Sequence, residues 1–135
     1  MDIDRKACAA AWSAYLASVP PEHPHRTHKP TAFAFGGEPA LADELGALVI
    51  AGSKRATTSL AVEYTSLNLP PPSVGDLSII LAGDGLPCAI IERTQVTTVA
   101  FDEVDAEYAA VEGEGDGSLA FWRAAGAERW FEKDD

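Results

Sequence analysis

The spacing of apolar residues predicts a helix at the start of the chain. From Ile3 to Leu16 they recur close to the period of an α-helix, and we expect this helix to end near Ser18. Four prolines then fall within residues 20–30 and cannot continue it, so this segment is predicted to be an extended connector.

A second apolar stripe predicts a helix over residues 39–51. Leu41, Leu45 and Leu48 fall on one face, and Gly52 follows as a left-handed stop. Threonines replace helix formers in residues 53–60, which predicts extended chain there. Lys54 lies at the junction between this helix and the extended segment.

The middle of the chain has the pattern of strands, and helices return after it. A rigid turn at residues 69–76 precedes a short apolar strand at 77–81, and Gly83-Asp84-Gly85 indicates a hairpin into a strand over 88–99. Helices are predicted at 105–111, capped by Asp105, and at 118–133. Because strand and helix do not alternate, the order predicts an α+β fold rather than a parallel doubly wound sheet.

Composition and charge limit the function. The chain has 135 residues, with 10 Lys and Arg against 21 Asp and Glu, and a net charge of −11. A broad basic surface that coats long nucleic acids is excluded, whereas a small ligand or a nucleic acid held at one local site is not. The longest apolar stretch, residues 45–51, is far short of the roughly 20 residues of a membrane span. With no secretory signal after Met1, we expect a cytoplasmic protein.

The first candidate for chemistry is the run from Gly52 to Thr57. Lys54 and Thr57 can present an amine and a hydroxyl together where the helix ends. The alternative is a solvated basic cluster that the helix dipole stabilises. The run is not a phosphate-binding P-loop, because that motif needs glycines before the lysine and a helix after it.

The second candidate is Glu112-Gly113-Glu114-Gly115-Asp116-Gly117, which has three acids at alternate positions. A calcium loop would need a carboxylate at its twelfth position, where this chain has Arg123. The alternatives are a solvated glycine-rich connection and a divalent metal at Glu112, Glu114 and Asp116. Crowded like charges favour a cation opposite them, and Lys54 or Arg123 can supply it. A carboxylate beside a lysine and a hydroxyl is a workable acid/base set.

Other metal-binding and aromatic residues are predicted to have structural roles. The connector carries three histidines, but flexible connectors rarely preorganise a metal site. Two cysteines far apart in sequence are expected to be free thiols. The three tryptophans lie on helical apolar stripes and are expected in the core. These residues are His23, His25, His28, Cys8, Cys88, Trp12, Trp122 and Trp130.

Several of these segments together resemble ASCH domains. The resemblance is carried by the runs Phe35–Leu45, Gly52–Thr57, Val74–Asp76, Pro87–Ile91, Phe101–Val104, Ala109–Asp116 and Ser118–Arg123. It implies a small PUA-like β-barrel decorated by helices, formed by residues 31–135. Residues 1–30, the N-terminal helix and proline-rich connector, then stand outside it.

The resemblance also implies a site. In bacterial relatives that process acylated cytidine, the working set is a lysine, a threonine three residues later and a glutamate, and these roles fall on Lys54, Thr57 and Glu112. Other relatives cleave or bind RNA. Residues expected to line the same cleft are Arg55, Tyr64, Arg93, Glu114 and Arg123. Relatives often carry a histidine near the position of Gly126, so this chain departs from them there.

Two functions follow as hypotheses. The first is a hydrolase that acts on a nucleoside or on single-stranded RNA, as an N4-acylcytidine amidohydrolase or a ribonuclease. The second is a module that binds a nucleotide or RNA without turnover. No cofactor is expected. The aromatic residues Trp130 and Phe131 in the last turns could pack against a second copy in a homodimer.

Overall fold

The computed structural model describes residues 2–131, which form two compact units. The first unit extends to residue 50 and includes residues 73–95, and the second contains residues 51–72 and those from 96 onward. Within the described part of the chain, no helix is both long and apolar enough to cross a membrane.

The helices of the first unit begin and end close to the predicted residues. Helix α1 (Arg5–Ala17) starts where the carboxylate of Asp4 accepts the backbone N–H of Ala7 at 2.9 Å. Helix α2 (Pro39–Ala51) is followed by Gly52 with φ +82°, the predicted left-handed stop.

The connector between α1 and the sheet is not extended throughout, contrary to the prediction. It contains a short 3₁₀ turn, η1 (Pro24–Thr27), in which the ring of His23 accepts the N–H of His25. The guanidinium of Arg26 donates to the carbonyls of Leu16, Val19 and Pro20 and folds the segment back on itself. Pro24 fits because the first position of a helical turn needs no N–H donor.

The described strands form an open sheet of three rather than the closed barrel that was expected. Strand β1 (Thr31–Phe33) pairs in parallel with β2 (Leu77–Leu81), which pairs antiparallel with β3 (Pro87–Glu92) through the predicted hairpin. The last strand ends at Glu92 and not near Val99. Residues 94–100 are exposed, so their apolar alternation has no buried face to occupy.

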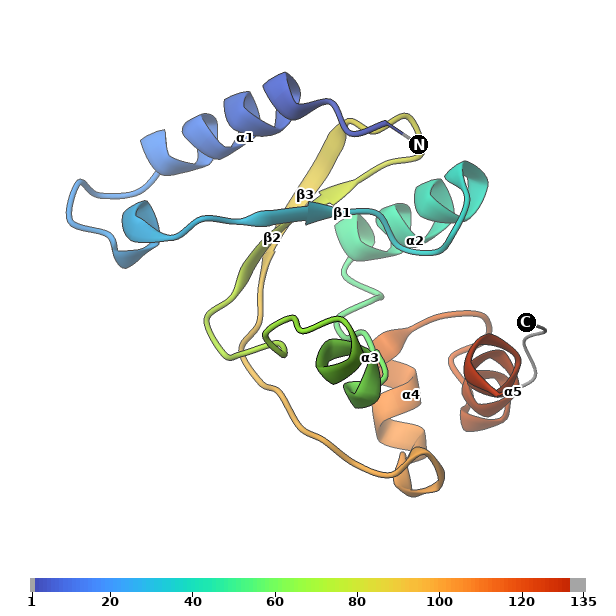
Figure 1. Ribbon diagram of the computed structural model, residues 1–135. Coiled ribbons are helices and arrows are strands. Elements are labelled where there is room, and N and C mark those ends of the chain that lie inside the picture. The colour runs from blue at the N-terminus through green and yellow to red at the C-terminus, as the bar shows by residue number, and fades with distance from the viewer. Residues whose placement is uncertain (1, 132–135) are drawn as a thin grey trace. The chain divides into compact units, whose positions relative to one another are not determined.

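Helices α1 and α2 cover opposite faces of this sheet (Figure 1). Ile79 and Leu81 pack with Cys8 of α1, and Ile80 packs with Leu45 of α2. Every residue of β2 is buried, which explains why four of its five residues are large and apolar. Cys8 and Cys88, the latter in the cluster on the α2 face, are both free thiols.

The second unit is helical. It contains α3 (Ala61–Ser66), the 3₁₀ turn η2 (Phe101–Glu103), α4 (Ala106–Glu112) and α5 (Leu119–Trp130). The predicted cap Asp105 accepts the N–H of Tyr108 at 2.8 Å and begins α4. The structure describes α5 as far as Trp130, and the predicted end at Lys133 lies outside the described residues. Helix α3 was not predicted, because its six residues are too few to show a period.

The core of the second unit lies between α4 and α5. Val104, Ala109 and Trp122 are buried together, with Phe101 and Trp130 packed around them. This arrangement confirms that Trp122 is a core residue. It also places the end of α4 next to the first half of α5, and the predicted acidic residue Glu112 lies at this point.

A candidate active site around Lys54

A close backbone approach brings Lys54 to the end of α4. The N–H of Arg55 donates to the carbonyl of Val111 at 2.8 Å. Gly113 ends α4 with φ +72°, and a Cβ atom on it would lie 2.2 Å from the carbonyl oxygen of Ser53. Only glycine combines this left-handed conformation with such a short approach. The glycine between the acids therefore sets the position of the lysine.

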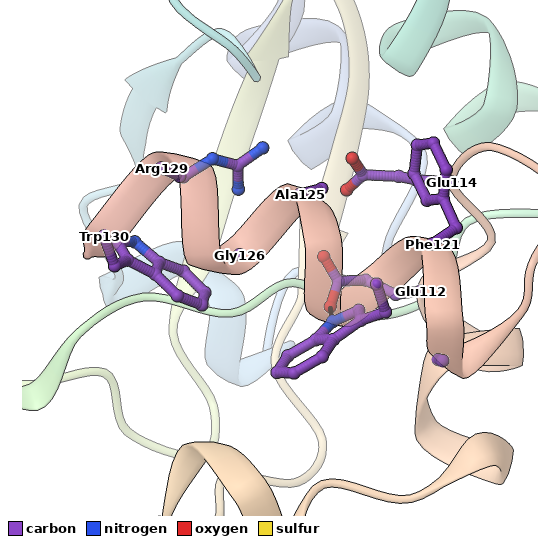
Figure 2. A pocket seen from close by; sticks show the side chains of 9 residues that line it. Glu112, Glu114, Phe121, Ala125, Gly126, Arg129 and Trp130 are labelled. Atoms are coloured by element: carbon purple, nitrogen blue, oxygen red, sulfur yellow. Dashed lines mark hydrogen bonds between the residues drawn. The ribbon is translucent and has the colours of Figure 1, made fainter. Parts of the chain in front are cut away.

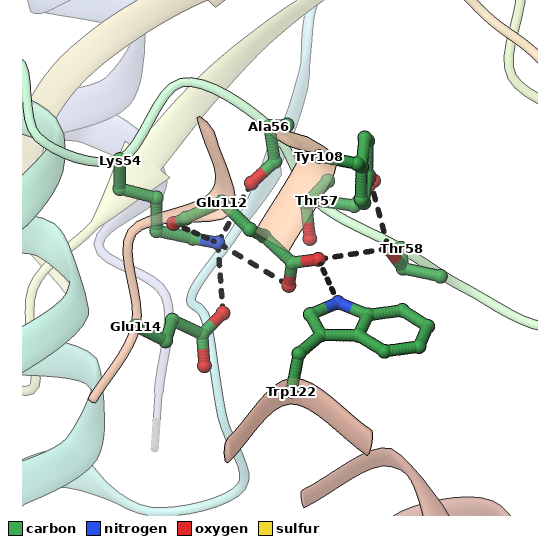
Figure 3. A network of polar contacts seen from close by, with 8 residues as sticks. All are labelled: Lys54, Ala56, Thr57, Thr58, Tyr108, Glu112, Glu114 and Trp122. Atoms are coloured by element: carbon green, nitrogen blue, oxygen red, sulfur yellow. Dashed lines mark hydrogen bonds and ion pairs between the residues drawn. The ribbon is translucent and has the colours of Figure 1, made fainter. Parts of the chain in front are cut away.

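Lys54 is buried, with 4% of its surface exposed, and its ammonium is fully engaged (Figure 3). The Nζ atom donates to the carbonyl of Ala56 and to Oε2 of Glu114, both at 2.8 Å, and more weakly to the carbonyl of Glu112 at 3.5 Å. Oε1 of Glu112 lies 3.7 Å away. Lys54 is therefore part of a buried ion pair and not of the solvated basic cluster that was one of the two predictions for this run.

Glu112 is equally buried, and two donors hold its other oxygen. Oε2 accepts the indole N–H of Trp122 at 2.6 Å and the hydroxyl of Thr58 at 2.9 Å. The hydroxyl of Tyr108 contacts Thr58 at 2.9 Å and donates to the carbonyl of Thr57 at 2.8 Å. Figure 3 shows this network enclosing the carboxylate from several directions.

The two carboxyl groups differ in acidity. Burial raises the pKa of Glu112, against the lowering effects of the Trp122 hydrogen bond and the Lys54 charge. Burial acts on Glu114 in the same direction, but the hydrogen bond and charge of Lys54 outweigh it and lower the pKa of that residue. Two neighbouring acids with pKa values shifted apart are the usual arrangement of an acid and an ionised partner.

A small pocket opens beside these acids (Figure 2). Its volume is about 20 Å³, close to what one water molecule needs. Glu112 and Glu114 line it together with Phe121, Arg129 and Trp130 of α5. In Figure 2 the guanidinium of Arg129 and the carboxylate of Glu114 point toward each other, and the charge of Arg129 also lowers the pKa of Glu114.

The structure places the predicted threonine at the edge of the network. Thr57 is exposed and contributes its carbonyl oxygen, and the hydroxyl that reaches Glu112 belongs to Thr58. Arg55 is also exposed, and its backbone N–H binds α4. The role of Thr57 stays a prediction, since an exposed hydroxyl next to the site can still meet a ligand.

The remaining predicted residues make hydrogen bonds to groups outside the Lys54 network. The hydroxyl of Tyr64 pairs with that of Ser59, and Arg123 donates to the carbonyls of Asp102 and Val104. Arg93 belongs to the other unit, where it donates to Ser78. Asp116 is exposed and accepts the N–H of Ser118.

Metal-binding side chains do not converge in the described part of the chain. No group of three or more His, Cys, Asp or Glu there is arranged to hold a metal ion. In the connector, His25 bonds the hydroxyl of Tyr15 at 2.7 Å and lies 3.5 Å from Glu92. The carboxylates of Glu112 and Glu114 face the ammonium of Lys54 instead.

Gly126 is buried on the wall of the pocket. A Cβ atom there would lie 2.8 Å from the ring of Phe101 and 3.0 Å from that of Trp130. A histidine at this position would have to displace an aromatic ring. The packing around Gly126 therefore leaves no space for a larger side chain unless a ring moves.

Sequence reasoning missed Thr58, Tyr108, Trp122 and Arg129 as members of the site. Two signals were present. A buried indole N–H needs an acceptor, so Trp122 required a polar neighbour. Tyr108 and Glu112 are four residues apart on a helix and share a face. No sequence pattern indicated Thr58 or Arg129, because their place near Glu112 and Glu114 depends on the tertiary structure.

The comparisons with known proteins agree with this fold. The sequence model of the ASCH domain matches residues 31–134, and the chain belongs to the ASCH domain family. The crystal structure of an ASCH domain from Lactobacillus crispatus JV V101 has a TM-score of 0.88 and 31% identity, over 98% of this chain and 82% of that one. A protein from Enterococcus faecalis V583 has a TM-score of 0.81 and 28% identity, over 94% and 74%. No curated protein matches the sequence.

Proposed function

We propose that this ASCH domain binds a compact nucleoside-like ligand beside Lys54 and hydrolyses an amide bond of it. The observation that carries the proposal is a buried lysine between two carboxyl groups whose pKa values are shifted in opposite directions. Such a set is costly to bury, and it is found where charge and protons must be managed away from water.

The roles follow from the chemistry of amide hydrolysis. A C–O bond forms at the acyl carbon, the C–N bond breaks and the leaving nitrogen takes a proton. The hydroxyl of Thr57 would attack or orient water. The positive charge of Lys54 would stabilise the negative oxygen, and Glu112 would give its proton to the leaving nitrogen and regain one from the attacking oxygen.

A compact ligand is favoured over a long RNA. The net charge is −11, which disfavours a polyanion. The guanidinium of Arg123 donates to the backbone carbonyls of Asp102 and Val104 and is therefore engaged within the chain. The pocket itself has room for about one water molecule, so a nucleoside must displace Phe121 or Arg129, both of which are exposed. These two side chains belong to one helix and can move without opening the core.

Turnover by the purified chain tests the proposal. N4-acetylcytidine and a short single-stranded RNA are each incubated with the wild type and with Glu112→Gln. We expect cytidine and acetate from the first substrate and a 10²- to 10⁴-fold loss in the variant, the usual effect of removing an acid/base group. Glu128→Gln, an exposed change in α5, is the matched control and should retain activity.

The other outcomes separate the rival hypotheses. RNA cleavage that depends on Glu112 would replace the amide by a phosphodiester as the substrate bond. Saturable binding without any product would make the chain a binding module. Equal activity in wild type and Glu112→Gln would refute the site.

A further inference from the structure

The buried polar cluster has one more negative group than positive ones. Glu112 and Glu114 share the ammonium of Lys54. Lys54 and Glu112 are buried and Glu114 is half-buried, whereas Arg129, whose charge also acts on Glu114, is exposed to solvent. A buried charge without a partner raises the free energy of the folded state, and protonation of one carboxyl group removes that charge. The cluster is therefore expected to hold a proton above the pH at which an exposed glutamate ionises.

The distances indicate which carboxyl group holds that proton. Glu114 accepts a hydrogen bond from Lys54 at 2.8 Å, and this contact favours its ionised form. Oε1 of Glu112 lies 3.7 Å from the same nitrogen, beyond hydrogen-bond distance. Two acceptors lie much nearer, the carbonyl of Ala56 and the carboxylate of Glu114, both at 2.8 Å, and the carbonyl of Glu112 follows at 3.5 Å.

The donors around Glu112 indicate which oxygen carries the proton. Trp122 donates to Oε2 at 2.6 Å, and an indole N–H can only donate. Thr58 also donates to Oε2, and its own oxygen accepts from the hydroxyl of Tyr108, which shares its hydrogen between Thr58 and the carbonyl of Thr57. An oxygen that receives two donors has no room for a hydrogen of its own.

We propose that Trp122 and Thr58 are positioning residues that fix the proton of Glu112 on Oε1, the oxygen that faces Lys54. Tyr108 acts through Thr58 by orienting its hydroxyl. The charged and titratable groups that face this carboxyl group are Lys54 and Glu114, with Tyr108 on α4 and, through Glu114, Arg129 on α5. The use of the proton in catalysis rests on the proposed function, whereas its location does not.

A titration by NMR locates the proton without any substrate. The full chain, labelled with ¹³C at the glutamate carboxyls and ¹⁵N at the indoles, is followed from about pH 4 to pH 9. We expect one glutamate signal, assigned by its loss in Glu112→Gln, to titrate above the exposed glutamates. The indole N–H signal of Trp122 should move with the same midpoint, because it reports on the carboxyl group that it binds.

Substitutions should move this midpoint in opposite directions. Trp122→Phe keeps an aromatic side chain, although a smaller one, and removes the N–H that stabilises the ionised form, so the midpoint should rise by about one pH unit. Thr58→Val should raise it in the same way. Glu114→Gln removes the competing anion and should lower it, since Glu112 then becomes the partner of Lys54.

Two control variants change residues that do not hydrogen-bond to the carboxyl group of Glu112. Trp12→Phe, in the first unit, and Thr57→Val should leave the midpoint unchanged. An ordinary glutamate midpoint for Glu112, or a Trp122 signal that does not follow it, would overturn the proposal. An unchanged midpoint in Trp122→Phe would also overturn it. If Trp122→Phe does not fold, the midpoint of Thr58→Val provides the same test. Absence of turnover with these results intact would refute only the proposed function.

Discussion

At the scale of single residues, the site depends on a lysine buried with two acids. Such pairs contribute little net stability when intact, because desolvation offsets the attraction, but removing one partner leaves an unpaired buried charge. The three residues are therefore coupled. A change at one of them acts mainly through what it leaves behind on the others.

Replacing Lys54 by methionine should destabilise the fold strongly. The variant keeps the shape of the side chain but leaves Glu112 and Glu114 without their cation, which should cost about 3–5 kcal/mol at neutral pH. Urea unfolding measures this loss. Arg55→Met, next to it and exposed, should change stability by less than about 0.5 kcal/mol. Equal effects of the two changes would contradict a buried ion pair.

The raised pKa of Glu112 predicts a pH-dependent effect of Glu112→Gln. In the wild type, the contribution of Glu112 to the free energy of unfolding is complete below its ordinary pKa of 4.5 and is lost as the pH rises through the higher folded value. The amide does not titrate, so the stability of the variant relative to the wild type should increase from about pH 4.5 toward pH 7.

Urea unfolding at a series of pH values, with Glu128→Gln as the exposed control, measures this difference. A relative stability that falls with rising pH would mean that Glu112 has a lowered pKa and is ionised in the folded protein. That result would contradict the arrangement described for the two carboxyl groups.

Part of the site could be predicted at the residue scale. Lys54 could be selected because it follows a helix-ending glycine, and Glu112 because it begins a run of alternating acids and glycines. The resemblance to ASCH domains then implied a role for each. The choice between Thr57 and Thr58 could not be made, since it depends on the direction in which an irregular segment turns. Trp122 has an apolar position, and sequence alone does not show the partner of its N–H.

At the scale of elements, glycine at the end of α4 controls the approach of the lysine segment. Gly113 and Gly117 both adopt positive φ, +72° and +77°, but only Gly113 has backbone atoms within reach of a Cβ. Gly117→Ala should therefore cost about 1 kcal/mol for the left-handed conformation alone. Gly113→Ala should cost clearly more and should also disturb the Lys54 hydrogen bonds.

Thermal unfolding of the two alanine variants provides the comparison. Equal losses would show that the contact of Gly113 with Ser53 does not constrain the chain. The indole signal of Trp122 gives an independent reading, because it should shift in Gly113→Ala and stay in place in Gly117→Ala.

The elements themselves were predictable where a period or a cap was present. Asp105 and Ser118 are capping residues whose side chains accept backbone N–H groups, and both helices begin where they indicate. Strand β1 and helix α3 are too short to show a period. The barrel was implied by the resemblance, and a count of paired strands cannot be obtained from spacing alone.

At the scale of the whole molecule, the net charge of −11 favours a small ligand. A neutral nucleoside should bind with an affinity that changes little between about 50 and 500 mM salt, because no counterions are released. An RNA of about 20 nucleotides should bind no more tightly than its nucleoside. Calorimetry at several salt concentrations tests this, and a steep loss of RNA affinity with salt would contradict it.

The most direct test of the account is whether a nucleoside meets Glu112. The full chain is titrated with N4-acetylcytidine while the carboxyl signal of Glu112 and the indole signal of Trp122 are followed by NMR. The account predicts that both signals shift saturably and with a common dissociation constant, while the indole of Trp12 stays unchanged. Saturable binding that leaves Glu112 and Trp122 unmoved would place the ligand elsewhere and contradict the assignment of the site.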